Sequence, residues 1–280
     1  MNGHNYKKKK LMTELPISRC ARRLTEAEKE QFQNWGYVKN LPVFDDSQIP
    51  ILQKGFEDML ALLPPHIHMS RVNNWHKANR WVYELSQTHA ILDYVEDLIG
   101  TNIIQWGAHC FAKFPGDGTE VPWHQDAQYW PLKPSKTVSV WLAIYDTDEQ
   151  NAAMRIVKGS HRYIFEHHII DKEHFVLDQE VDREAIKTED IVSMDLKAGE
   201  ISLHDNQLLH GSGPNLSDRI RAGQTMRFCP TEVICDLNVW PKFESYLVRG
   251  VDEFKHNPLG KEPKGYSYPI KLGQGSWEFQ

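Results

Sequence analysis

The polar and apolar positions in the first hundred residues repeat with the period of an α-helix. Thr25 and Glu28 form a T-x-x-E capping box ahead of apolar residues at helical spacing, and Gly36 is expected to end this helix. A second helical pattern covers residues 47–63 and ends at two prolines, and a third covers residues 90–99 and ends at a glycine. The N-terminal third of the chain is therefore predicted to be mostly helical.

The pattern changes after residue 101, where short runs of aromatic and β-branched residues alternate with polar ones. Such runs predict strands at residues 102–114, 137–145, 154–157, 191–194, 200–204 and 224–230. Turns rich in Gly, Pro and Ser separate these runs. Many short strands with such punctuation favour a β-sandwich or barrel.

Three segments fall outside this regular spacing. Residues 166–189 are charged and irregular and are predicted to be a long insertion, in which His167 and His168 are expected to be solvated. Residues 1–23 include four consecutive lysines and are expected to form a flexible tail. Residues 24–280 are then predicted to be one domain, whose last part, after residue 257, wraps around the surface.

Composition narrows the class of protein. The 280 residues are 40% hydrophobic and 25% charged, as in soluble globular proteins, and the net charge of −6 argues against a nucleic-acid partner. No apolar run approaches the ~18 residues that span a bilayer, and the start lacks the apolar segment of a secretion signal. Four scattered cysteines without a C-x-x-C pair indicate a reduced, cytoplasmic protein.

The candidate chemistry centres on the sequence His124-Gln125-Asp126. In an extended segment alternate side chains point the same way, so His124 and Asp126 can face one point. A third ligand is expected at His210. Two imidazoles and one carboxylate form the facial triad of Fe(II) oxygenases, which leaves coordination positions open for cosubstrate and oxygen.

An H-x-D pattern alone is weak evidence, since 14 histidines and 38 acidic residues produce it by chance, and a lone histidine is more often part of a core. The sequence after His210 adds a second feature. Arg221 lies eleven residues downstream and could hold a carboxylate bidentately, with Arg219 as the alternative.

Further motifs are spread over much of the chain. They are HQDAQYWP at residues 124–131, SVWLA at 139–143, Asn151, GSHR at 159–162, HGS at 210–212, Asn215, Ser217 and Arg221. In this combination the chain resembles the phytanoyl-CoA dioxygenase (PhyH) family of Fe(II)/2-oxoglutarate oxygenases over most of residues 24–230. The resemblance implies a mainly β fold with flanking helices, built on a double-stranded β-helix (a cupin-like jelly roll).

The resemblance also implies roles for individual residues. His124, Asp126 and His210 would bind Fe(II). The cosubstrate 2-oxoglutarate would be held at its distal carboxylate by Arg221 and Ser212, and Trp141 would line its pocket. Lys77 loosely matches a family lysine near the cosubstrate.

Two positions depart from the family. Ala152-Ala153 stands where a Gly-Cys pair is usual, and Lys158 replaces a usual proline. Both lie away from the expected ligands, so these loops are expected to differ in shape from those of the family while the chemistry stays the same. A related branch of halogenating enzymes has Ala or Gly at the position of Asp126. Because Asp126 is present, hydroxylation of an unactivated C–H bond with O2 is the expected reaction.

The substrate is expected to be a small polar molecule. His109 shares the parity of Gly107 and Phe111 on the expected pocket face, and with Tyr129 it is a candidate substrate-binding residue. Other polar or cationic side chains before the motif are Arg71, Asn73 and Arg80. These groups favour an anionic or zwitterionic substrate, with an organophosphonate such as 2-aminoethylphosphonate as the specific hypothesis.

Several alternatives stay open at this point. A fatty acyl-CoA or an amino-acid derivative could be the substrate of the same reaction. A cupin-like protein could use a metal without 2-oxoglutarate, and a non-catalytic binding protein could share the fold. Turnover of 2-oxoglutarate to succinate distinguishes the first pair of possibilities from the second.

Overall fold

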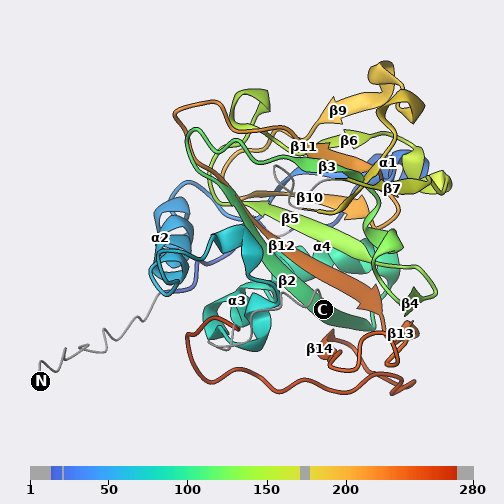
Figure 1. The fold of residues 1–280 in the computed structure, drawn as a ribbon. Helices are drawn as coiled ribbons and strands as arrows, with labels where there is room; N and C mark the ends of the chain where they lie inside the picture. The colour runs from blue at the N-terminus through green and yellow to red at the C-terminus, as the bar shows by residue number, and fades with distance from the viewer. Residues whose placement is uncertain (1–13, 21, 171–176, 270–280) are drawn as a thin grey trace, which may run out of the picture.

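The computed structural model describes residues 14–20, 22–170 and 177–269, and two antiparallel sheets face each other in it (Figure 1). The larger sheet has the order β1 (Tyr37–Pro42), β10 (Glu200–Asp205), β5 (Val138–Ala143), β12 (Arg221–Pro230), β2 (Ile103–Lys113) and β14 (Tyr246–Arg249). The smaller sheet has the order β3 (Val121–His124), β11 (His210–Ser212), β6 (Arg155–Val157) and β9 (Ile191–Ser193). This is the predicted jelly roll, and the prediction of its class is confirmed.

The helices begin and end close to their predicted bounds. Helix α1 (Glu26–Trp35) starts at Thr25 with both hydrogen bonds of the capping box, and Gly36 ends it in the left-handed conformation at φ 81°. The other helices are α2 (Ile49–Leu60), α3 (Arg80–Leu85) and α4 (His89–Ile99). The sequence pattern did not predict α3, nor did it predict β1 and β14, which pair with the larger sheet at its two edges.

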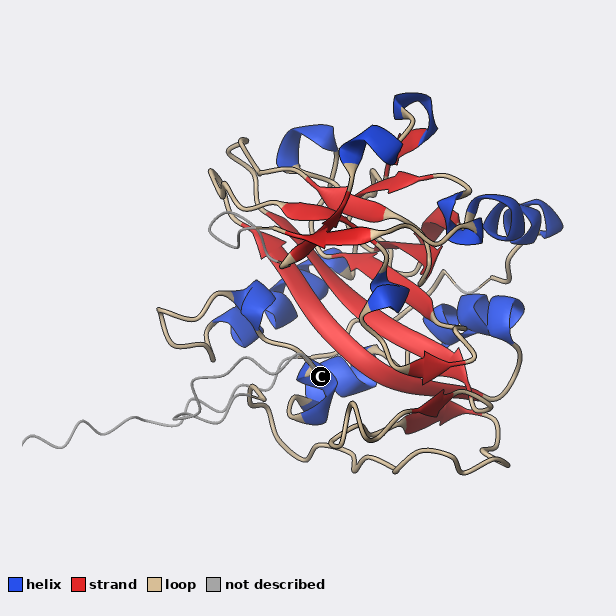
Figure 2. Cartoon of the chain, turned by 45° about the vertical axis from the view of Figure 1, so that its right-hand side comes forward, coloured by secondary structure: helices blue, strands red, loops and turns tan. Residues whose placement is uncertain are grey.

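The two faces of the larger sheet have opposite character. Residues on its outer face are apolar and pack against the helices, as do Ala108 on β2, Val140 on β5 and Leu203 on β10. Figure 2 shows several helices along the outside of the long strands, and further helical segments beside the smaller sheet. Residues of the other parity face the smaller sheet and include many polar side chains. The main hydrophobic core therefore lies outside the jelly roll, and its interior is left for polar chemistry.

Segments outside the regular strands are also attached to this core. In the part expected to be a tail, the Ile17 amide donates to Gln48 Oε1 over 2.8 Å and the Ser18 hydroxyl donates to the Val43 carbonyl over 2.7 Å. The run of four lysines lies outside the described residues. Towards the C-terminus, the Ser267 amide donates to the Ala78 carbonyl, which fixes the wrapping segment.

The insertion contains a hairpin of β7 (His167–Ile169) and β8 (Gln179–Val181), whose connection lies outside the described residues. A further pair of short strands consists of β4 (Leu132–Lys133), which follows the HQDAQYWP segment, and β13 (Ile234–Cys235). No helix in the described ranges is both long and apolar enough to cross a membrane. All four cysteines fall within these ranges, and each is a free thiol.

One of the two positions that depart from the family has an unusual backbone conformation. Ala152 has a positive φ of 67°, in the left-handed region that glycine adopts without a steric penalty. A glycine at this position in relatives is therefore explained by the turn. The turn is kept here because Asp148 and Asn151 form a reciprocal pair of capping hydrogen bonds just before it.

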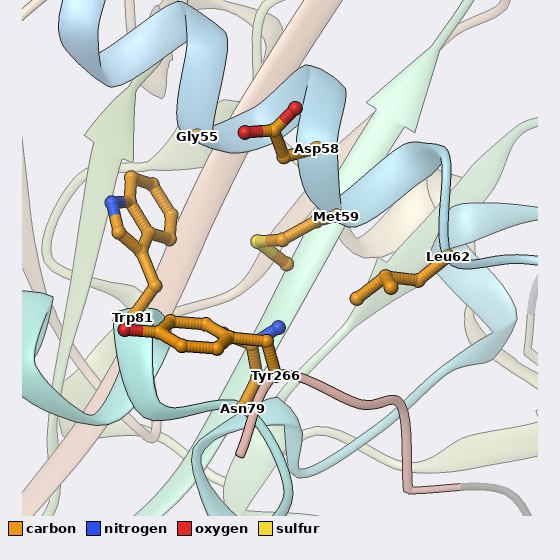
Figure 3. A pocket seen from close by; sticks show the side chains of 7 residues that line it. All are labelled: Gly55, Asp58, Met59, Leu62, Asn79, Trp81 and Tyr266. Carbon is orange, nitrogen blue, oxygen red and sulfur yellow. The ribbon is translucent and has the colours of Figure 1, made fainter. Parts of the chain in front are cut away.

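A tightly packed contact joins α2 to α3 beside a small hollow (Figure 3). The hollow measures about 10 Å³, room for one water at most, and is separate from the candidate active site. A Cβ atom on Gly55 would lie 2.1 Å from the ring of Trp81, which is buried. We expect Gly55→Ala to lower the free energy of unfolding by about 2 kcal/mol, measured by denaturant titration.

The matched control is Gly118→Ala, because no atom lies within 4 Å of a Cβ placed there. We expect a change of about 0.5 kcal/mol or less for this variant. Equal stabilities of the two variants would contradict the packing argument.

Candidate active site

The three predicted ligands meet between β3 and β11 of the smaller sheet. His124 and His210 are Cα partners across the two strands, and their ring centroids are 4.1 Å apart. Gln125 is extended, at φ −108° and ψ 123°, so Asp126 returns to the same side as His124. Ligand atoms of the three residues lie within 4.8 Å of one another, and all three side chains are buried.

Backbone carbonyls fix the orientation of both imidazoles. His124 Nδ1 donates to the Pro122 carbonyl over 2.8 Å, and His210 Nδ1 donates to the Leu208 carbonyl over 2.9 Å. A carbonyl can only accept, so each Nδ1 carries the proton and each Nε2 keeps a free lone pair. His124 Nε2 lies 3.6 Å from Asp126 Oδ1. The described residues thus supply two imidazole nitrogens and one carboxylate, which fits a divalent transition metal such as Fe(II).

The protonation states of His210 and Asp126 at neutral pH also suit metal binding. Burial and then the charge of the His124 ring lower the pKa of His210 to about 3, so His210 is neutral. Burial alone would raise the pKa of Asp126, but the His124 ring and the charge of Arg227 outweigh it and lower the pKa. The carboxylate is therefore anionic without competition from a proton.

A second buried cluster contains the residues expected to bind the cosubstrate. The Arg221 guanidinium lies 4.9 Å from the centre of the Trp141 ring, and its Nε has no hydrogen-bond partner in the described ranges. Burial lowers the pKa of Arg221 to about 10, which leaves it charged at neutral pH. A buried guanidinium with free donors and an aromatic face fits a carboxylate ligand.

Lys113 joins Arg221 to Ser212, and sequence reasoning missed it. Lys113 and Arg221 are Cα partners on β2 and β12, and Lys113 Nζ donates to Ser212 Oγ over 2.9 Å. Burial and then the charge of Arg221 lower the pKa of Lys113 to about 7. At neutral pH Lys113 is therefore only partly protonated, and an anion beside Ser212 would favour its charged form.

Comparison with known proteins now bears on this geometry. A family model described as phytanoyl-CoA dioxygenase (PhyH) matches residues 52–223, well over half of the chain. The chain belongs to the phytanoyl-CoA dioxygenase family. The match includes all three candidate metal ligands, Arg221 and Lys113.

One curated sequence relative and two solved structures are similar to this chain. A probable alpha-ketoglutarate-dependent hypophosphite dioxygenase of Stutzerimonas stutzeri is 28% identical over 152 residues, 53% of each chain. The chain thus spans about half the length of this curated relative. The solved structure of the non-heme monooxygenase ThoJ has a TM-score of 0.70 at 24% identity, covering 85% of this chain and 89% of that one. CytC3 with Fe(II) and alpha-ketoglutarate has a TM-score of 0.65 at 22% identity, covering 89% and 97%.

Arg219 and Lys77 were also candidates for the cosubstrate pocket of this PhyH-family chain, and the structure does not bring them to it. Arg219 pairs with Asp148 over 2.8 Å on the surface. Lys77 Nζ lies 3.3 Å from Glu244 and donates to the Lys242 carbonyl. Their charges already have partners there, so we assign neither residue to the cosubstrate.

The expected substrate residues differ in their surroundings. His109 is buried on the inner face of β2, and its Nε2 donates to the Ser70 carbonyl over 2.8 Å. Tyr129 lies beside the triad, 6.2 Å from the His124 ring between centroids. Its hydroxyl is buried without a hydrogen-bond partner among the described residues. Arg80 pairs with Glu84 on the surface, so it is not part of this group.

The insertion contacts the metal-binding motif directly. The amide of Gln125 donates to His167 Nε2 over 3.1 Å, so the expectation that His167 is solvated was wrong. The Gln125 side chain donates to the carbonyls of Tyr163 and Gln207 and accepts from the Phe165 amide. Gln125 therefore ties the two ligands beside it to the insertion and to the loop before His210.

The position of Lys113 leads to a prediction. We expect Lys113→Met to weaken 2-oxoglutarate binding about tenfold, because the amine that donates to Ser212 Oγ next to Arg221 is lost. Titration calorimetry with Mn(II) in place of iron measures this. The matched control is Lys77→Met, which we expect to leave the affinity within about twofold. A larger loss in Lys77→Met than in Lys113→Met would overturn the assignment.

Proposed function

We propose that this protein is an Fe(II)/2-oxoglutarate-dependent dioxygenase that hydroxylates an unactivated C–H bond of a small anionic substrate. The observation that carries the proposal is the buried triad, with both Nε2 atoms and one carboxylate turned to a common point. The cluster of Arg221, Lys113 and Ser212 supports the use of 2-oxoglutarate. A metal-binding protein that does not use 2-oxoglutarate would have no need of that second cluster.

When bound, iron and 2-oxoglutarate supply the oxidising chemistry. Together with O2 they would supply the oxidation that converts a C–H bond to C–OH, with succinate and CO2 as the coproducts of 2-oxoglutarate. His124, Asp126 and His210 would hold the metal and leave positions for cosubstrate and oxygen. Arg221 and Ser212 would orient 2-oxoglutarate, while the buried walls keep water away.

The polar interior supports a small anionic substrate. Inner-face polar atoms of Ser139, Ser202 and His204 are buried without hydrogen-bond partners among the described residues, as is the Tyr129 hydroxyl. Such groups suit a substrate with several hydrogen-bonding atoms more than a hydrocarbon tail. The relative named for hypophosphite suggests a phosphorus oxyanion, and 2-aminoethylphosphonate is the specific substrate that we propose.

Substrate-dependent formation of succinate tests the proposal. Purified protein with Fe(II) and 2-oxoglutarate would be given 2-aminoethylphosphonate, phytanoyl-CoA and a free amino-acid derivative in separate assays. We expect stimulation by the phosphonate. Stimulation by phytanoyl-CoA alone would overturn the substrate and keep the enzyme class, whereas no succinate in any assay, together with no 2-oxoglutarate binding, would overturn the class.

We also propose that the protein works in a reducing compartment such as the cytoplasm. The four free thiols, three of them buried, support this.

A further inference from the structure

Arg227 is a second cation on β12, six residues after Arg221, and it is half-buried. An even separation along a strand puts both side chains on the inner face, with their Cα atoms about 20 Å apart at about 3.3 Å per residue. A five-carbon cosubstrate that extends from Arg221 to the metal ligands is too short to reach Arg227 as well. The second guanidinium is therefore available for a different ligand.

The residues around Arg227 position its side chain towards the interior of the jelly roll. The register between β12 and β2 shifts at Arg227, which leaves Trp106 as the extra residue of a β-bulge. The guanidinium lies 5.6 Å from the Trp106 ring centre and 4.9 Å from that of Trp130. A Cβ atom on Gly107 would lie 3.2 Å from Arg227 Cδ, so the glycine leaves room for the arginine stem.

Arg227 has no anionic partner of its own in the part of the chain that the structure describes. Its Nε is buried without a hydrogen-bond partner there, and Asp126 is the one acidic group whose charge acts on its pKa. A metal ion would neutralise that carboxylate. The two indole rings offset only part of the cost of burying a cation.

A row of polar groups connects Arg227 to the metal ligands. Arg227 pairs with Ser139 on β5, and Ser139 pairs with His204 on β10, so the three lie side by side across three strands. Ser139 Oγ and His204 Nδ1 are buried without partners among the described residues. The ring of His204 lies 5.2 Å from that of His210, between centroids.

We propose that Arg227, with Ser139 beside it, binds the anionic group of the substrate, and that this contact selects small phosphonates or carboxylates. The inference rests on the proposed function and adds the residue that recognises the substrate. A guanidinium presents parallel N–H donors that match the oxygens of either anion. Bound there, the remainder of the molecule would lie along the row towards His204 and the metal ligands.

Binding of small anions to the full chain tests the inference, and it does not require the substrate to be identified first. The anaerobic protein with Mn(II) and 2-oxoglutarate would be titrated with methylphosphonate and, separately, with propanoate. We expect at least one anion to bind, and Arg227→Gln to weaken that binding about ten- to a hundredfold. Arg227→Lys, which keeps the charge but not the paired donors, should fall between the two. Whichever of methylphosphonate and propanoate binds more tightly identifies the anionic group of the substrate.

The effect of Arg227→Gln on 2-oxoglutarate affinity distinguishes a role in substrate binding from a purely structural role. We expect Arg227→Gln to change 2-oxoglutarate affinity by less than about threefold, since that affinity depends on Arg221. The matched control is Arg22→Gln. The Arg22 guanidinium lies 5.4 Å from the centre of the Tyr94 ring, away from the site, so this variant should leave the affinities for the small anion and for 2-oxoglutarate unchanged.

Two results would overturn the inference. One is that neither anion binds to wild-type protein that binds 2-oxoglutarate, and the other is that Arg227→Gln binds the anion as tightly as wild type. Failure of the proposed function looks different, because the wild-type protein would then neither bind 2-oxoglutarate nor form succinate.

Discussion

We expect His210→Ala to lower Fe(II) affinity by more than about 100-fold and succinate formation by at least about 1000-fold. Loss of groups that only orient metal ligands typically costs 10- to 100-fold, so loss of a ligand nitrogen should cost more. The remaining pair, His124 and Asp126, would hold the metal weakly. Metal content after anaerobic loading and succinate yield measure the two effects.

The matched control is His161→Ala. His161 Nε2 donates to the Gln33 carbonyl over 3.2 Å, near helix α1 and away from the triad. We expect metal content to be unchanged in this variant. Wild-type iron binding in His210→Ala would remove the basis for the whole proposed function, since the third ligand would then be elsewhere.

The second large effect is expected at the cosubstrate cluster. Arg221→Leu should weaken 2-oxoglutarate binding about 100-fold or more, because truncating one partner of a buried, hydrogen-bonded charge pair costs about 2–5 kcal/mol. Metal binding should persist, since His124, Asp126 and His210 are intact. Calorimetry with 2-oxoglutarate, after metal content is checked, measures the loss.

Arg219→Leu controls for the loss of a nearby positive charge. Arg219 makes a surface ion pair with Asp148, and such pairs contribute about 0–1 kcal/mol to stability. We expect 2-oxoglutarate affinity within about twofold of wild type. If Arg219→Leu weakened binding more than Arg221→Leu, the distal carboxylate would have to lie at the surface, outside the jelly roll.

The separate positions of Arg221 and Arg227 on β12 would allow one interior to hold the two anions that we propose. Arg221 shares its surroundings with Lys113, whereas the charge of Arg227 acts on Asp126. Like charges close together in a dry interior would destabilise each other. In the proposed arrangement, the distance along β12 would keep the two anions apart.

Local sequence signals predicted most elements of the fold. The capping box at Thr25 and the glycines after α1 and α4 gave helix ends, because caps depend on neighbouring residues only. The alternation of side-chain types in residues 102–114 predicted β2. It arises because one face of this strand packs against the helices. In contrast, β1 and β14 are short edge strands, and their pairing depends on residues far away in the chain.

The sequence by itself determined the helix and strand pattern, the His124-Gln125-Asp126 motif and the likeness to the PhyH family. These follow from spacing, which the chain carries locally. Only the tertiary structure shows Arg221 buried and Arg219 paired at the surface, brings Lys113 to Ser212 and sets Arg227 beside Ser139. Those contacts depend on strand register and on closure of two sheets, where a shift of one residue turns a side chain to the opposite face.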